Sequence, residues 1–199
     1  MTTSDYPAVL LVPGWSDRGR VMRHCRQFLL QEGWPESHVR WVDFGDRYGS
    51  NIQHAEEIEH AVRALCSSAG VSSIAVVAHS MGGLALRYYI ARSGSAAIHT
   101  AIFVGTPHSG TYAAYFAWGS GGREMRPDSN FLRELNQRQL PSDVRAHCIR
   151  TPLDTRVLPG SSAWLAGTQC HVVRAPTHPR MMRHRTTLRL IRELLLQPA

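Results

Sequence analysis

A serine at position 80 stands where its hydroxyl could act as a nucleophile. It follows the apolar, β-branched run of residues 73–78, which is typical of a buried strand, and it precedes a predicted helix over residues 81–92. A sharp turn between the two elements would place the hydroxyl at a helix N-terminus, where N–H groups without partners favour developing negative charge. The pattern therefore predicts covalent catalysis through Ser80.

The residues two positions to either side of this serine are small, as such a turn requires. Ala78 and Gly82 leave room for strand and helix backbones that come close together. The segment AHSMGG thus matches the G-x-S-x-G nucleophile elbow, with alanine in the first position. An ordinary turn that happens to contain serine is the alternative, but the position between a strand and a helix favours the elbow.

A serine nucleophile needs a base to accept its proton and an acid to orient that base. In the α/β hydrolases, which carry this elbow, both groups follow the serine in the chain. Asp154 directly follows the fifth predicted strand and is the predicted acid. Asp143 lies at the opposite end of that strand, and Asp128 precedes a helix, where it is predicted to be an N-cap.

The predicted base is His178, because it lies in the loop that leaves the sixth predicted strand. His171 lies within that strand, and His184 lies in the helix that follows. His79, next to the serine, is predicted to point away from the serine side chain. His108 follows the fourth strand and is predicted to line the site.

Two backbone N–H groups are predicted to bind the oxyanion of the tetrahedral intermediate. One belongs to Met81, directly after the nucleophile, and the other to Trp15, in the loop VPGWSDRG after the first strand. This loop contains neither a G-x-G-x-x-G pattern nor a P-loop lysine, so a nucleotide site is not expected there.

Strand and helix patterns alternate along the chain, which predicts an α/β fold with a mostly parallel sheet and helices on both faces. The predicted strands cover residues 8–12, 39–44, 73–78, 99–105, 143–150 and 169–175. The predicted helices cover residues 21–31, 51–70, 81–92 and 130–136, with Asn51 as the predicted cap of the second. An arginine-rich helix closes the chain, with its apolar face formed by Leu188, Ile191, Leu194 and Leu195. No repeat or linker divides the sequence, so residues 1–199 are predicted to form a single domain.

The composition narrows the class of protein further. With 43% hydrophobic and 19% charged residues, the chain is expected to be globular rather than disordered. No apolar run approaches the roughly 20 residues that span a bilayer, and no signal-peptide pattern opens the sequence. A cytoplasmic location is therefore the default, with secretion expected if the chain is a processed form. The four scattered cysteines lack paired C-x-x-C spacing and are predicted to be small buried apolar residues.

The chain is basic, with a formal net charge of +7, and it contains arginine but no lysine. The arginines near the C-terminus also fit the solvent-exposed face of an amphipathic helix, so no nucleic-acid partner is expected. We expect a monomer that acts on a small-molecule ester or lipid, has no transmembrane segment, and makes at most transient contact with a lipid surface.

Several segments together resemble the small, lidless bacterial lipases and esterases of the α/β-hydrolase superfamily. LLVPGW resembles their oxyanion segment, with Pro13 in place of the usual histidine, and AHSMGG resembles their elbow. VGTPHSGT, at residues 104–111, and EMRPDSNFLRELN, at residues 124–136, resemble two further segments of these lipases. The resemblance spans nearly the whole chain and implies an ester hydrolase that uses no cofactor and no metal.

The segment between Thr111 and Pro127 is too short for the helical lid of large lipases. An open serine favours short-to-medium acyl esters or acylglycerols and activity without interfacial activation. The predicted substrate lining includes Trp15, His108, Tyr112 and Met181, with Tyr115, Phe116, Trp118 and Met182 as further candidates. A thioesterase, amidase or acyltransferase on the same fold remains an alternative, as does a non-catalytic protein that binds a lipid or partner.

Overall fold

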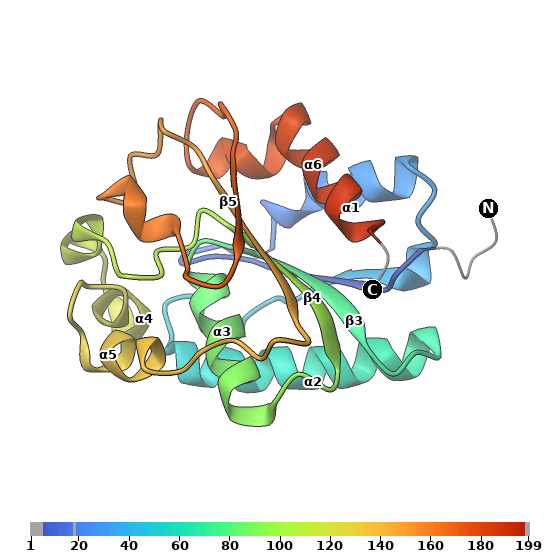
Figure 1. Cartoon of the computed structure of the whole chain (residues 1–199), viewed down its shortest axis with the longest axis horizontal. Coiled ribbons are helices and arrows are strands. Elements are labelled where there is room, and N and C mark those ends of the chain that lie inside the picture. Colours follow the sequence, from blue (N-terminus) through green and yellow to red (C-terminus); the bar gives the residue numbers. More distant parts are fainter. Residues whose placement is uncertain (1–5, 18, 198–199) are drawn as a thin grey trace.

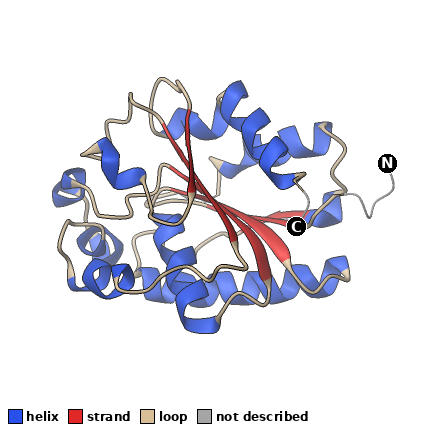
Figure 2. Ribbon diagram, in the orientation of Figure 1, coloured by secondary structure: helices blue, strands red, loops and turns tan. Residues whose placement is uncertain are grey.

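A computed structural model describes residues 6–17 and 19–197 of the chain, and six strands in them form one sheet (Figures 1 and 2). The order across the sheet is β2-β1-β3-β4-β5-β6, and all five neighbouring pairs are parallel. The strands are β1 (Val9–Val12), β2 (Val39–Trp41), β3 (Ile74–His79), β4 (Ile98–Val104), β5 (Arg145–Arg150) and β6 (Gln169–Val172).

Helices cover both faces of this sheet, as Figure 1 shows. On one face lie α1 (Met22–Gln31) and α6 (Arg185–Leu195), and on the other lie α2 (Asn51–Ala69) and α3 (Met81–Ser93). The remaining helical elements are short: α4 (Gly119–Glu124), α5 (Asn130–Asn136), and the 3₁₀ turns η2 (Glu36–His38), η3 (Tyr112–Phe116), η4 (Gly160–Ala163) and η5 (Pro179–Arg183).

Side chains of the central strands alternate between two hydrophobic cores. Leu10 and Val12 of β1 pack in the core under α2 and α3, whereas Val9 and Leu11 pack in the core under α1 and α6. Both faces of these strands are therefore buried, which explains why they appear in the sequence as continuous apolar runs. The predicted apolar face of α6 is confirmed, because its members Leu188, Ile191, Leu194 and Leu195 are all buried.

The predicted alternation of strands and helices is confirmed, and α5 has the predicted limits. Two helix caps differ from expectation. Ser50, rather than Asn51, caps α2 by accepting a hydrogen bond from Ile52 N–H. Ser129, rather than Asp128, caps α5 by accepting one from Leu132 N–H. In both helices the neighbouring hydroxyl reaches the first-turn N–H groups, and Asp128 instead adopts a left-handed backbone with φ of 59°.

Helix α4 is absent from the sequence prediction, because its sequence GSGGRE has little intrinsic helix preference. Contacts with the rest of the protein stabilise it. The Glu124 carboxylate accepts hydrogen bonds from Ser50 Oγ and from the backbone and side-chain nitrogens of Asn51, at the start of α2. A Cβ atom at Gly121 would lie 2.6 Å from Met81 Sδ, so this glycine lets α4 pack closely on the start of α3.

Across the described residues, none of the helices combines the length and the apolar character that a membrane crossing needs. The beginning of the sequence, which the signal-peptide prediction also concerns, includes residues 1–5, and these lie outside the described residues.

Candidate active site

Ser80 occupies a sharp turn between β3 and α3, as the sequence predicts. Its backbone has φ of 54° and ψ of −127°, a conformation that a residue with a Cβ rarely adopts. Its N–H donates to the Val104 carbonyl oxygen at 2.9 Å, so the end of β4 holds the turn in place. The serine thus stands at the carboxyl edge of the parallel sheet and at the N-terminus of α3.

The glycines around Ser80 are required because backbones and side chains crowd the turn. A Cβ at Gly82 would lie 2.2 Å from the Pro13 carbonyl oxygen, at the end of β1. A Cβ at Gly14 would lie 2.8 Å from the Cβ of Ser80, so the loop after β1 passes directly beside the nucleophile. The prediction that Gly82 must be small is confirmed.

We expect Gly82→Ala to lower the free energy of unfolding by about 3 kcal/mol, because the new methyl group would overlap a backbone oxygen that cannot rotate away. Urea titration of the wild type and the variant measures this loss. Gly160→Ala is the matched control, since the atom nearest to its new Cβ would be the end of the Arg150 side chain, at 3.9 Å. An equal effect of the two substitutions would contradict the crowding at the turn.

Asp154 and His178 lie side by side at the ends of neighbouring strands. Their side chains are joined by a 2.7 Å hydrogen bond from Nδ1 to Oδ2, and both are 4% exposed. Oδ1 of Asp154 accepts from the backbone N–H groups of Arg156 and Val157, at 2.8 and 2.9 Å. Burial alone would raise the pKa of Asp154, but the His178 ring and these N–H groups lower the pKa below its ordinary value. The carboxylate is therefore ionised at neutral pH.

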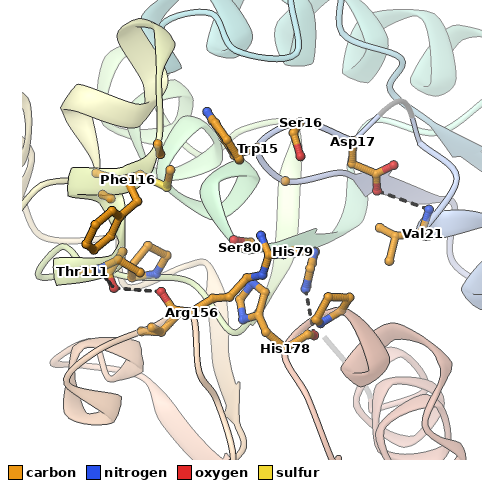
Figure 3. Close-up of a pocket in the computed structure, with 18 of the residues that line it drawn as sticks. Trp15, Ser16, Asp17, Val21, His79, Ser80, Thr111, Phe116, Arg156 and His178 are labelled. Atoms are coloured by element: carbon orange, nitrogen blue, oxygen red, sulfur yellow. Dashed lines mark hydrogen bonds between the residues drawn. The ribbon is translucent and has the colours of Figure 1, made fainter.

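The segment GTPHSGT braces the loop that carries Asp154. The Thr111 hydroxyl donates to the Arg156 carbonyl oxygen at 2.8 Å and accepts from Leu158 N–H at 2.9 Å (Figure 3). Thr106, in the same segment, packs against the elbow, since a Cβ at Gly83 would lie 2.0 Å from its Oγ1. One short segment thus contacts both the nucleophile turn and the acid loop, a role that the sequence analysis did not assign to it.

Ser80, His178 and Trp15 line a common pocket of about 520 Å³ (Figure 3). Within the described parts of the chain, the backbone N–H groups of Trp15 and Met81 have no hydrogen-bond acceptor. Both flank Ser80, one in the loop that Gly14 brings against it and the other at the first position of α3. Two backbone N–H groups without an acceptor in the described residues thus flank the nucleophile.

Six of the eight predicted lining residues do not contribute to this pocket, namely His108, Tyr112, Tyr115, Trp118, Met181 and Met182. His108 is buried between Arg87 and Cys148, because the turn after β4 directs its ring into the protein. Tyr112 is 61% exposed on the outer side of η3, and Met181 is fully buried in the core beside α1. Instead, apolar lining comes from Val21, Pro107, Ala113, Ala114, Phe116, Ala117, Met125, Val157 and Pro179.

His79 contacts the site in a way that its position in the sequence does not reveal. Its ring lies against that of His178, with the centroids 4.7 Å apart, and its Nε2–H donates to the His178 carbonyl oxygen at 3.4 Å (Figure 3). Although it was predicted to point away from the serine, it lines the same pocket. Burial, followed by the charge of His178, lowers the pKa of His79 to about 3, so this ring is neutral at physiological pH.

The low pKa of His79 predicts that the protein loses stability in mild acid. Between its ordinary value of 6.5 and the folded value of about 3, the unfolded state binds a proton that the folded state does not. Stability therefore falls as the pH falls, and His79 contributes about 2 kcal/mol of this loss by about pH 5. Urea titrations at several pH values measure the free energy of unfolding. We expect the loss of this free energy in acid to be smaller by about 2 kcal/mol in His79→Gln and unchanged in the exposed control His60→Gln. An equal loss in the wild type and both variants would contradict the role of His79.

Within the described residues, no three His, Cys, Asp or Glu side chains are arranged to hold a metal ion.

A parallel sheet with a strained serine at the carboxyl end of a central strand defines the α/β-hydrolase fold. Comparison with known proteins agrees with this class. The chain belongs to the palmitoyl protein thioesterase family, because the model of that family matches residues 8–148, more than half of the sequence. The protein is therefore an α/β-fold hydrolase of the palmitoyl protein thioesterase family.

Solved structures of three proteins show the same fold. The mature lipase BlEst2 of Bacillus licheniformis superposes with a TM-score of 0.82 at 11% identity, over 96% of this chain and 92% of that one. Lipase B of Aspergillus fumigatus superposes with a TM-score of 0.82 at 18% identity, over 98% of this chain and 54% of that one. The lin2722 gene product of Listeria innocua superposes with a TM-score of 0.70 at 12% identity, over 98% of this chain and 95% of that one.

Proposed function

We propose that this protein hydrolyses carboxylic esters with short-to-medium acyl groups, including acylglycerols, through an acyl-enzyme on Ser80. One observation carries the proposal: Ser80 shares its pocket with His178, whose Nδ1 is bonded to a buried, ionised carboxylate. Nucleophile, base and orienting acid are the three parts that serine hydrolysis requires.

In the proposed reaction, Ser80 Oγ attacks the ester carbonyl carbon while His178 Nε2 accepts its proton. Asp154 holds the imidazole through Nδ1 and stabilises the positive charge that develops on the ring. The N–H groups of Trp15 and Met81 bind the oxyanion. His178 then returns the proton to the leaving alcohol, and afterwards activates the water that hydrolyses the acyl-enzyme.

The shape of the pocket supports a small-molecule acyl substrate. Its volume lies in the range of about 300–1,000 Å³ that is typical of ligand sites. Phe116, at 87% exposure, and Ala117 stand at its rim, and only the short elements η3 and α4 lie between Thr111 and Met125. Such a short cover favours direct entry of soluble esters and activity without an oil–water interface.

Thioester hydrolysis is a second candidate, and the family match favours it. The same serine, base and oxyanion donors serve both ester and thioester bonds, because both reactions pass through a tetrahedral oxyanion. The proposed role of Ser80 is therefore the same in the two candidate reactions, which differ only in the leaving group.

A panel of substrates tests the proposal. It comprises p-nitrophenyl esters from acetyl to palmitoyl, octanoyl thioesters and an octanoyl anilide. We expect kcat/KM to be highest for short-to-medium esters. We also expect a hyperbolic dependence of activity on ester concentration that is already visible below the solubility limit of the ester. Thioester turnover above that of the matched ester would favour the second candidate. Activity that begins only above the solubility limit of the ester would contradict the open site.

A further inference from the structure

The pocket beside Ser80 is unevenly charged. Three arginines line it, namely Arg20, Arg156 and Arg183, together with one carboxylate, that of Asp17. The arginines come from three different loops: one follows the oxyanion segment, one follows the acid, and one follows the base. Three separate parts of the chain thus direct positive charge to a single opening.

These three guanidinium groups have no salt bridge or side-chain hydrogen bond with any residue in the described part of the chain. Elsewhere on the surface, Arg26 and Arg192 pair with Glu36 and Glu32. Because none of the three guanidinium groups is paired within the described residues, each is available to bind a ligand.

Most of the apolar lining lies on one side of the nucleophile, whereas two of the three arginines, Arg20 and Arg183, belong to segments on the other side. In Figure 3, Phe116 and Thr111 lie on one side of Ser80, and Asp17 and Val21 on the other. The apolar side is built by η3 and its neighbours, including Ala113, Ala114, Phe116, Ala117 and Met125. Arg20 directly precedes Val21, and Arg183 ends η5, which packs against α1. With its acyl chain along the apolar side, a substrate would therefore direct its leaving group toward Arg20 and Arg183.

Arg156 extends furthest toward the reaction centre. Its side chain crosses the pocket toward Ser80 and passes over the His178 ring in Figure 3. Its charge also contributes to lowering the pKa of the neighbouring His79. The backbone of Arg156 is fixed, because its N–H donates to Asp154 and its carbonyl oxygen accepts from Thr111. A fixed backbone with an unpaired guanidinium is suited to hold an anion beside the scissile bond.

Resting on the proposed acyl-hydrolase function, we propose that the pocket selects acyl esters or thioesters whose leaving group carries a phosphate. The planar guanidinium fork matches phosphate oxygens, and three such groups suit a polyvalent anion better than a neutral alcohol. The phosphate itself does not react. The bond from the carbonyl carbon to the leaving oxygen or sulfur breaks, water supplies hydroxyl to the acyl carbon, and the leaving group departs with the proton.

Two matched substrate pairs test this selectivity, one with a glycerol phosphate as the leaving group and one with coenzyme A. The ester pair is 1-octanoylglycerol 3-phosphate and 1-octanoylglycerol, and the thioester pair is octanoyl-coenzyme A and S-octanoylpantetheine. Within each pair the acyl group and the bond that breaks are the same. We expect the phosphate-bearing member to have a kcat/KM about tenfold higher at low salt, with the preference shrinking as salt is added.

Arginine variants assign the preference to the pocket. Arg156→Gln, Arg20→Gln and Arg183→Gln should each lower the ratio of phosphate-bearing to neutral kcat/KM by about fivefold. Arg23→Gln and Arg180→Gln are matched controls, because these exposed arginines lie on the same segments but outside the pocket. Circular dichroism verifies that every variant is folded.

The outcomes separate this proposal from the proposed function. A preference in one pair alone supports the proposal and identifies that leaving group as its source. Equal kcat/KM within both pairs overturns the phosphate preference while leaving the hydrolase function intact. A preference that the control variants reduce as much as the pocket variants also overturns it. No turnover of any member, together with no labelling by a fluorophosphonate, overturns the proposed function and this inference with it.

Discussion

Ser80→Ala lowers kcat/KM for the best p-nitrophenyl ester by about a millionfold, which is the largest effect that we expect of any single substitution. Without Oγ no acyl-enzyme can form, and the remaining acceleration comes only from binding and the oxyanion donors. The substitution keeps the Cβ and the backbone contact with Val104, so we expect the fold to persist. Initial rates with purified protein, together with circular dichroism, measure both properties.

The matched control for this substitution is Ser109→Ala, which removes an exposed hydroxyl from the neighbouring segment. We expect its activity to stay within about twofold of the wild type, as is usual for exposed surface sites. Ester hydrolysis that survived in Ser80→Ala at more than about a hundredth of the wild-type rate would contradict the role of this serine.

Asp154→Asn should lower kcat by about ten-thousandfold. The amide of asparagine carries no charge to stabilise the imidazolium, and its nitrogen can donate to His178 Nδ1, which would leave the proton on Nε2. That nitrogen could then no longer accept the serine proton. The two backbone N–H bonds to Oδ1 can persist to the amide oxygen, so the loop is expected to keep its structure. Single-turnover rates with an activated ester measure the loss.

Asp143→Asn serves as the control, because that carboxylate accepts from Ser95 Oγ at the opposite edge of the sheet. We expect little change in its kcat. A similar kcat in both variants would show that the carboxylate bonded to His178 does not assist the reaction.

The sequence predicts the nucleophile turn well because its determinants are local. The strand run, the helix after it and the small residues at positions 78 and 82 all lie within residues 73–92. The steric reason for Gly82, however, is the carbonyl oxygen of Pro13, nearly seventy residues earlier. The local pattern therefore depends on a contact between Gly82 and Pro13 that is seen only in the folded sheet.

Asp154 and His178 were identified from chain order, and the structure brings them within hydrogen-bond distance. Parallel strands make this prediction feasible, because loops that follow neighbouring strands emerge at the same edge of the sheet. The same reasoning fails for side-chain direction. His108 and Met181 follow the correct strands, but each points into the protein interior rather than into the pocket.

Long-range packing accounts for the remaining errors. Glycine-rich α4 is helical because Glu124 is bonded to the start of α2 and Gly121 fits against Met81. The contact of His79 with His178 joins residues 99 positions apart. The unpaired state of the pocket arginines is likewise a property of the folded surface. The sequence shows that these arginines are present, but it does not show whether their side chains are paired in the folded protein.

The most direct test of the central claim is the site of covalent labelling by a fluorophosphonate, read by mass spectrometry of tryptic peptides. The account predicts one adduct per chain, on Ser80 within the peptide of residues 64–87, and none in Ser80→Ala. An intact, folded wild type that takes up no label, or takes it up on another residue, would contradict the claim that this serine is an activated nucleophile.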